Sequence, residues 1–347
     1  MTLYALEAVD DALDATSAFL RDIDRTDWVK LAVVVFFIGG TGGNVSSVPR
    51  GGGPSSMGSP IDLGPRAWLL VVAVLAVVVL LVILFALVGS IMEFVLVESL
   101  RQEAVTVRRY WSRRWSQGLR LLGFRIGLGL AVLAGLTVLL VPVIAPLFDV
   151  GPFAGVGGGF SIALLVVLIP AFVLLALAAA LVYGFTTAFV VPIMILEDRG
   201  VLSAWRRLWP TIRAQWKQYL AYAVAAFVLS LVGGFIVTII ALLGIVVLLV
   251  PFGLLALLGA AIYFLAAELV GIAVIAVVAV LFVVSAIAVF ALARVPLATF
   301  LRYYALLVLG DVDPELDLIP ERRAAIRGDA PADDGDGNGG DGNPLAG

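Results

Sequence analysis

The sequence predicts an all-α membrane protein, a polytopic bundle of about six transmembrane helices in pseudo-repeated hairpins with amphipathic cytoplasmic helices. Three observations lead to this fold class. The chain is 62% hydrophobic and only 14% charged, which lies outside the range of soluble globular domains. It contains long uncharged stretches, and about 20 helical residues are enough to cross a hydrocarbon layer of about 30 Å. Its apolar runs do not alternate with polar residues, as the strands of a membrane barrel would.

The uncharged stretches define the expected membrane domain, residues 28–310, and the spans within it. A charge at the centre of the bilayer costs at least about 2.5 kcal/mol, so charged residues mark the ends of each span. The predicted spans are 28–40, 67–92, 126–147, 162–191, 219–246 and 269–293.

Two parts of this assignment have alternatives. The run at 28–40 is shorter than an ordinary span, so it is either a span in a locally thinned bilayer or a re-entrant or interfacial helix. Residues 218–293 are long enough for three spans, which would move the C-terminus across the membrane. We favour two spans because Pro251, followed by Phe252 and Gly253, is typical of a turn.

Both ends of the chain are acidic. Residues 1–27 carry seven acidic residues between apolar positions such as Leu6, Leu13 and Phe19, a spacing that predicts an acidic amphipathic helix and not a basic signal peptide. Residues 311–347 are rich in Asp, Gly and Asn, which predicts an acidic, largely disordered tail. Acidic ends and a shortage of lysine favour a halophilic archaeon as the source, with a GC-rich genome as the alternative explanation.

Basic residues gather in two tryptophan-bearing segments, each of which follows a long apolar stretch. Residues 99–125 hold seven arginines and one glutamate, and residues 201–217 repeat the pattern. An apolar face with a basic flank is typical of a helix at the membrane surface that contacts anionic lipid; the alternative is a helix packed on the spans with solvated arginines. The candidate lipid-phosphate contacts are Arg108, Arg109, Arg113, Arg114, Arg206, Arg207 and Arg213.

The distribution of basic residues also predicts the orientation. If both termini are cytoplasmic, cytoplasmic segments and inner span ends hold twenty of the 22 lysines and arginines, and the outer loops hold only Arg50 and Arg66. Cytoplasmic loops of membrane proteins carry such an excess of Lys and Arg. We therefore expect a multi-pass protein of the cell membrane with both termini cytoplasmic.

The residue inventory argues against an enzyme. The chain has no cysteine and no histidine, so it has no thiolate nucleophile, no imidazole base and none of the commonest metal ligands. Carboxylates alone can bind Mg²⁺, but no spacing motif in this sequence brings several together. We expect no catalytic residue, no metal, no cofactor and no nucleic-acid partner.

Three carboxylates are candidate site residues. Glu268 is the only Asp, Glu, Lys or Arg between Lys217 and Arg294, so it is either an intramembrane acid or an interfacial acid that faces water. Glu98 and Glu197 occupy matching positions at the ends of two apolar stretches. We expect both to be structural, as helix caps or in ion pairs with Arg101, Arg199 or Arg206; the alternative is that they bind a ligand.

The segment from Ile195 to Gly200, with Ala204-Trp205-Arg206-Arg207 and Trp216 after it, resembles the membrane domain associated with glycerophosphoryl diester phosphodiesterases. The core of the resemblance covers residues 67–310, and the whole chain is similar to uncharacterised haloarchaeal members of that superfamily. The catalytic domain of these enzymes needs histidine, which this chain lacks. The resemblance therefore implies a shared membrane architecture without the catalytic activity.

Two classes of function fit these observations. The first is a non-enzymatic membrane scaffold or envelope-homeostasis protein that contacts anionic lipid, or an unknown protein partner, through its basic cytoplasmic helices. The second is a small transporter or lipid-handling protein built from repeated hairpins. A transporter needs polar side chains at mid-depth, and the predicted spans contain few of them. We favour the first class.

Overall fold

The computed structural model describes residues 4–42, 65–148, 158–265 and 267–328, and all regular elements within these ranges are helical. The α-helices are α1 (Tyr4–Asp22), α2 (Arg25–Gly42), α3 (Pro65–Arg101), α4 (Val107–Ile144), α5 (Gly158–Phe185), α6 (Val191–Glu197), α7 (Val201–Ala214), α8 (Trp216–Leu265), α9 (Glu268–Val312) and α10 (Pro320–Arg327). Shorter helical turns are η2 (Ala145–Phe148), the π-helical η4 (Thr186–Val190) and η5 (Pro314–Leu316).

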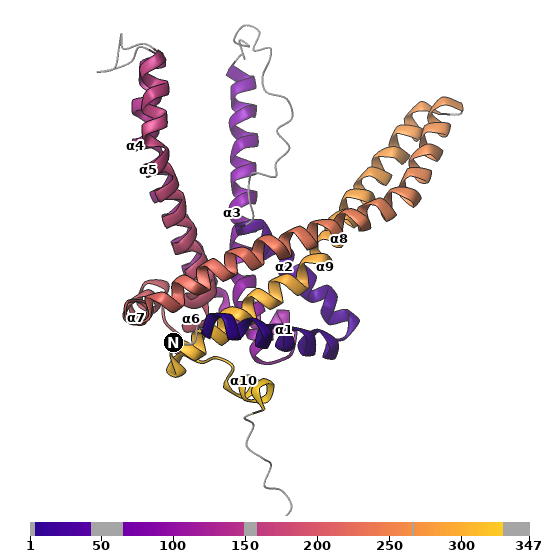
Figure 1. The fold of residues 1–347 in the computed structure, drawn as a ribbon. Helices are drawn as coiled ribbons and strands as arrows, with labels where there is room; N and C mark the ends of the chain where they lie inside the picture. Colours follow the sequence, from indigo (N-terminus) through magenta and orange to yellow (C-terminus); the bar gives the residue numbers. More distant parts are fainter. Residues whose placement is uncertain (1–3, 43–64, 149–157, 266, 329–347) are drawn as a thin grey trace, which may run out of the picture.

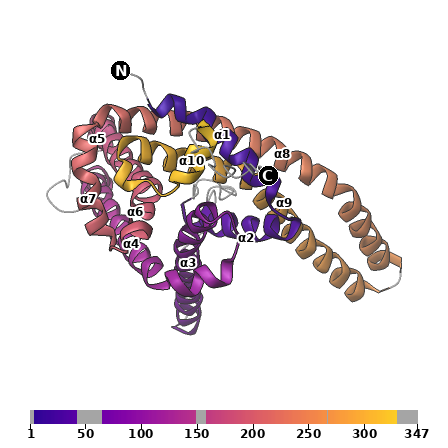
Figure 2. The same cartoon turned by 90° about the horizontal axis from the view of Figure 1, so that it is seen from below.

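Three arms rise from a common base (Figure 1). The arms are α3, the pair α4 and α5, and the hairpin of α8 and α9. The base consists of α1, α2, α6, α7, α10 and the adjoining ends of the long helices. Viewed from below, α4, α5, α6 and α7 gather on one side of the base, and α8 and α9 extend to the other (Figure 2).

Five helical segments are long and apolar enough to cross a membrane: Trp68–Arg101, Val107–Ile144, Phe160–Glu197, Trp216–Leu265 and Glu268–Val312. Their most apolar 18-residue windows are between 0% and 11% buried in the protein. Water would be an unfavourable solvent for so much continuous apolar surface, whereas lipid is a suitable one. The expectation of an all-α fold with several membrane-length apolar helices is therefore confirmed.

The sixth predicted span, 28–40, is not among these five segments. It forms most of α2, whose Leu31 and Val34 are fully buried in the base. Near its end, the Phe36 ring contacts the Phe85 ring of α3 at a centroid distance of 5.7 Å. The contact lies where the exposed part of α3 ends, because residues 68–82 are exposed and residues 89–100 are buried. Helix α2 thus packs partly on the base, and the structure does not confirm it as a sixth span.

Between residues 218 and 293 the structure has two long helices, as favoured, but the turn is not at Pro251. Helix α8 continues through Pro251 to Leu265, and α9 begins at Glu268. A proline inside a helix removes one backbone hydrogen bond, and membrane helices tolerate this loss. The two helices are in close contact near the tip, where a Cβ added to Gly271 would collide with the backbone of Tyr263.

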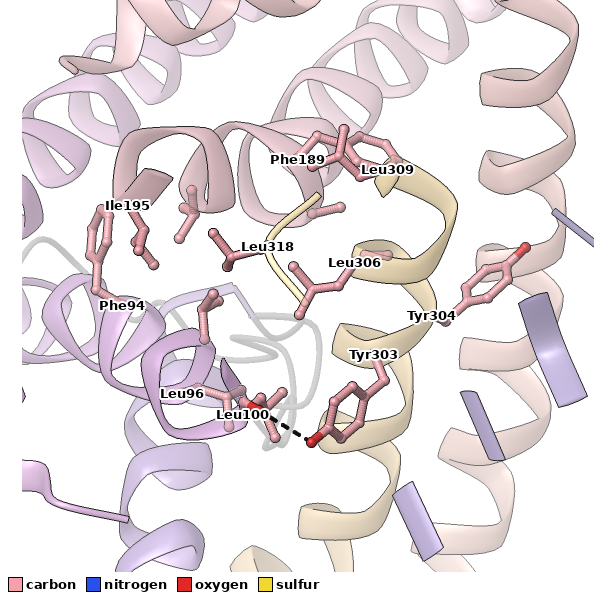
Figure 3. Packing of buried hydrophobic residues seen from close by; sticks show 14 of the residues in the cluster. Phe94, Leu96, Leu100, Phe189, Ile195, Tyr303, Tyr304, Leu306, Leu309 and Leu318 are labelled. Atoms are coloured by element: carbon pink, nitrogen blue, oxygen red, sulfur yellow. Dashed lines mark hydrogen bonds between the residues drawn. The ribbon is translucent and has the colours of Figure 1, made fainter. Parts of the chain in front are cut away.

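The hydrophobic core lies in the base, where ends of α3, α6 and α9 converge (Figure 3). All side chains from Thr299 to Gly310 of α9 are buried except the half-buried Leu301, which contrasts with the exposed arm of the same helix. The Tyr303 hydroxyl donates a hydrogen bond to the Leu100 carbonyl of α3 at 3.4 Å. Each long helix therefore has a protein-packed end and an exposed apolar arm.

Helix α1 packs on this core through a face of small residues. Ala8, Ala12 and Ala15 are fully buried, and the Phe19 ring lies 6.1 Å from the Tyr303 ring. By contrast, Leu6 and Leu13 are 60% and 53% exposed. The alanines allow close approach to α9, so the buried face of the predicted amphipathic helix differs from the leucine stripe that the spacing suggested.

Residues 311–328 of the predicted acidic tail fold onto the base as the end of α9, η5 and α10, whereas residues 329–347 lie outside the described ranges. Arg327 joins this segment to α1, with nitrogen–oxygen distances of 2.8 Å to Asp311 and 2.7 Å to Asp11. Hydrogen bonding to Asp311 raises the pKa of the Arg327 guanidinium above its ordinary value. These pairs hold α1 and α10 at the same end of the molecule.

The arrangement predicts which positions share a side of the membrane. The chain has no native cysteine, so single cysteines give a clean test. Arg66→Cys and Leu265→Cys lie at the ends of two arms, and Ser17→Cys and Ser112→Cys lie in the base. A membrane-impermeant thiol reagent applied to intact cells should label one of these pairs and spare the other. Labelling of one arm-end variant together with one base variant would contradict the arm-and-base arrangement.

Candidate functional site

A buried ion cluster lies where arms and base meet, and we call it the Glu93 cluster. It consists of Glu93 from α3, Arg125 from α4 and Arg302 from α9, whose side chains are only 2%, 9% and 7% exposed. The Arg125 Nη2 atom lies 2.9 Å from Oε1 of Glu93, and Arg302 Nη2 pairs with Oε2 of the same carboxylate. One carboxylate therefore connects three long helices.

Polar groups on α3 and η4 complete the cluster. Arg125 donates hydrogen bonds to the hydroxyls of Thr187 at 3.3 Å and Ser90 at 3.4 Å. Arg302 donates through Nη1 to the backbone carbonyl of Thr187. Thr187 lies in the π-helical turn, which interrupts the α-helical pattern at the end of α5; such turns are frequent at functional positions. The turn thus attaches a fourth helix to the same cluster.

The cluster holds two guanidinium charges and one carboxylate, which leaves an excess positive charge in a buried place. The ring of Tyr183 partly compensates, since the Arg125 Cζ atom lies 5.0 Å from its centroid. Arginine stays protonated in proteins, and both Glu93 oxygens are engaged, so this arrangement offers no free acid or base. The role of the Glu93 cluster is structural: it holds the helices in fixed positions.

A second buried polar network, one and a half turns further along α3, involves Glu98. Its Oε2 atom lies 3.0 Å from Nη2 of Arg114 on α4. Arg114 also donates to the Gln117 side-chain carbonyl at 3.2 Å, and the Gln117 amide donates to the Met194 carbonyl of α6 at 3.1 Å. The partner of Glu98 is thus Arg114 from the next helix, instead of the expected Arg101.

Glu197 belongs to a partly exposed network at the end of α6. It lies 2.8 Å from Nε of Arg199 and 3.6 Å from Nε of Arg207. Arg207 also reaches Glu315 of η5 at 2.7 Å, so the network connects α6 and α7 to the C-terminal segment. Glu268 lies elsewhere, at the exposed end of the α8–α9 hairpin, where the Tyr263 hydroxyl donates to it at 3.4 Å.

The seven candidate lipid contacts fall into two groups. Arg114 pairs with the buried Glu98, and the partly exposed Arg207 pairs with Glu315 at the surface. The other five are exposed, and no salt bridge joins them to any residue within the described ranges. These exposed arginines are Arg108, Arg109 and Arg113 on α4 and Arg206 and Arg213 on α7.

Exposed aromatic surface accompanies the arginines on α7. Leu202 and Trp209 are 66% and 48% exposed, and the Arg213 guanidinium lies 5.1 Å from the Trp209 ring. Leu202 and Trp209 form a shallow hollow of about 370 Å³ together with Trp205, Arg206 and Pro210. The other face of α7 buries Val201, Ala204 and Leu208. One face of helix α7 therefore packs against the protein, and the opposite face, which is apolar and basic, is exposed.

The sequence reasoning missed Glu93, although a signal was present. An acid within a strongly apolar helix needs a partner, and Glu93 follows directly on an uncharged stretch. The partners were not visible, because Arg125 and Arg302 are 32 and 209 residues away in the chain. Within the described ranges, no group of three or more acidic side chains is placed to hold a metal ion.

Removal of the Glu93 charge tests the role of the cluster. Glu93→Gln keeps the side-chain shape but leaves two buried guanidiniums without a carboxylate, a change that typically costs about 3–5 kcal/mol. Glu315→Gln is the matched control, because Glu315 also pairs with an arginine but its side chain is 82% exposed, so the loss should stay below about 1 kcal/mol. Thermal unfolding of the full chain in detergent measures both. Equal effects of the two substitutions would exclude a structural role for the cluster.

Comparison with known proteins identifies a family without indicating an activity. A family model described as a family of unknown function, DUF7544, matches residues 3–319. Comparisons with curated proteins and with solved structures gave no match. None of the comparisons links the chain to the membrane domain of glycerophosphoryl diester phosphodiesterases or to haloarchaea, so that resemblance stays a prediction. Because the match spans most of its length, including all three arms and the Glu93 cluster, the chain belongs to the DUF7544 family of unknown function.

Proposed function

We propose that this protein is a non-enzymatic membrane scaffold whose base holds anionic lipid headgroups through the exposed arginines of α4 and α7. The observation that carries the proposal is the division of the arginines into two groups. Buried arginines of the base, such as Arg114 and Arg302, have carboxylate partners. The five exposed candidates, like the exposed Arg120 of α4, form no salt bridge with a described residue. An anionic surface is the natural complement of such a basic group.

The exposed apolar side chains beside these arginines are better suited to a membrane surface than to water. Trp115 on α4 is 44% exposed, and Trp209 and Leu202 are exposed on α7. Tryptophan is favoured at the boundary between lipid and water, and arginine stems lie along apolar surface while their guanidiniums reach phosphate. Helices α4 and α7 are neighbours in the base (Figure 2).

The proposal includes an orientation and a location. Because cytoplasmic segments carry the excess of Lys and Arg, the base with α1 and α10 faces the cytoplasm, and the arms cross the cell membrane. This orientation requires one further crossing between α1 and the outer end of α3, where the predicted span 28–40 lies. The acidic ends suit a high-salt cytoplasm, as in a halophilic archaeon. A non-enzymatic role agrees with the absence of cysteine and histidine and with the full engagement of Glu93. An additional protein partner of the base is compatible with this role.

A small transporter or lipid-handling protein, the alternative, has less support. Such a protein needs polar groups that face a path between the arms. Two hydroxyls on the arms are instead bonded within their own helices, that of Thr137 to the Leu133 carbonyl at 2.9 Å and that of Thr238 to the Gly234 carbonyl at 2.8 Å. These groups are not directed at a substrate.

The experiment measures lipid selectivity of the full chain. In bilayers of mixed phosphatidylglycerol and phosphatidylcholine, brominated lipids quench tryptophans in contact with them, and the ratio of quenching gives the preference for the anionic lipid. Each basic residue near an anionic surface contributes about 1 kcal/mol, and salt weakens this contribution. Replacement of all five exposed arginines by Gln should therefore lower the preference for phosphatidylglycerol at least tenfold at low salt.

Arg66→Gln is the control, because Arg66 is exposed at the far end of α3. It should leave the preference unchanged. If the variant with five substitutions kept the wild-type preference at every salt concentration, the arginines would not bind headgroups, and the proposal would be wrong.

A further inference from the structure

An apolar groove lies between α1 and the first half of α8, outside the α4 and α7 region. Its volume is about 670 Å³, within the range of ligand-binding pockets. Leu6 and Val9 of α1 form one wall. The other wall is a stripe on α8 at helical spacing. The stripe includes Lys217, Leu220, Val224 and Val228.

The groove is open because of how α1 packs. Helix α1 runs beside α8 (Figure 2). Its alanine face, with Ala8 and Ala12, is buried against the base, and Leu6 and Val9 line the groove with α8. On the α8 side, Leu220 and Val224 remain 54% and 58% exposed. Two helices thus present large apolar side chains to a shared space that neither of them fills.

The length of the groove matches one lipid chain in one leaflet. From Lys217 to Val228 a helix rises about 17 Å at 1.5 Å per residue. Half of a hydrocarbon layer of about 30 Å is about 15 Å. The groove also starts at the base and follows α8 toward its exposed arm, so it runs from the expected headgroup level into the expected apolar layer.

One end of the groove carries charge and the remainder does not. Lys217 is the charged residue of its lining, lies 5.9 Å from the Trp216 ring, and forms no salt bridge with a described residue. On α1, Asp11 points to the opposite side, where it pairs with Arg327. A ligand with an apolar chain and an anionic end complements this arrangement.

We propose that the groove binds the hydrocarbon chain of a membrane lipid whose anionic headgroup lies at Lys217. Contact of the lipid with both α1 and α8 would attach the N-terminal helix to the membrane-embedded hairpin. At this site, unlike the basic region of α4 and α7, burial of the lipid's hydrocarbon chain supplies most of the binding free energy. Retention of the lipid should therefore survive high salt, and it does not depend on the five exposed arginines.

The test counts lipid molecules that remain on the full chain after extensive detergent washing, by native mass spectrometry with added phosphatidylglycerol or phosphatidylcholine. The wild-type protein should retain one phosphatidylglycerol even after a wash in high salt. Val224→Trp fills the groove and should abolish this retention, as should Leu220→Trp in case the first variant folds poorly. Lys217→Gln should still bind a lipid through its hydrocarbon chain, but the preference for phosphatidylglycerol should fall about fivefold.

Val247→Trp is the matched control, because Val247 is 70% exposed on the same helix but far from the groove. It should retain the lipid. Equal retention by Val224→Trp, Leu220→Trp and Val247→Trp would overturn the proposal. It would also be overturned if the wild-type protein were a dimer that both groove variants converted to a monomer, since the occupant would then be a second copy of the chain.

Discussion

The two oxygens of the Glu93 carboxylate are the point on which the fold depends, since they bind an arginine from α4 and another from α9. The arms have little contact with one another outside the base and the α4–α5 and α8–α9 pairs (Figure 1). Apolar packing alone gives weak orientation among helices in lipid, because lipid chains are as apolar as leucine. A charged network with fixed geometry supplies that orientation. Its desolvation cost is compensated by hydrogen bonds from both guanidiniums to Thr187.

Each long helix has an exposed arm and an end that is buried in the base, and its composition differs between the two parts. On α3, apolar side chains from Trp68 to Leu84 are exposed, whereas Phe94, Leu96 and Leu100 are buried in the base. The polar residues Ser90, Glu93 and Glu98 appear only after the exposed part ends. Polar groups are therefore placed where other helices can satisfy them. The exposed arginines of α4 and α7, and Lys217 on α8, lie on the outside of the same base, where the proposed lipid headgroups would meet it.

Much of this architecture was predictable because charge and hydropathy are local properties of the chain. The uncharged stretches located α3, α4, α5, α8 and α9, and the acidic pattern located α1. The errors arose where tertiary contacts decide. The apolar run 28–40 gave no indication that α2 packs on the base through Leu31 and Phe36. Pro251 lies inside α8 because a lipid-exposed turn would leave backbone groups without hydrogen bonds. No local pattern could show that Glu93 pairs with Arg302, or that Arg114 faces inward while Arg113 faces outward.

The most direct test of this account is a double-mutant cycle between Glu93 and Arg302, measured as the free energy of unfolding of the full chain in mixed micelles. Such a cycle isolates the interaction between two side chains from the separate effects of each substitution. If the shared carboxylate connects α3 to α9, Glu93→Gln and Arg302→Gln should be coupled by about 1–3 kcal/mol, and the double variant should be more stable than the sum of the single losses predicts. Additivity within about 0.5 kcal/mol would contradict the account, because the two residues would then stabilise the protein independently.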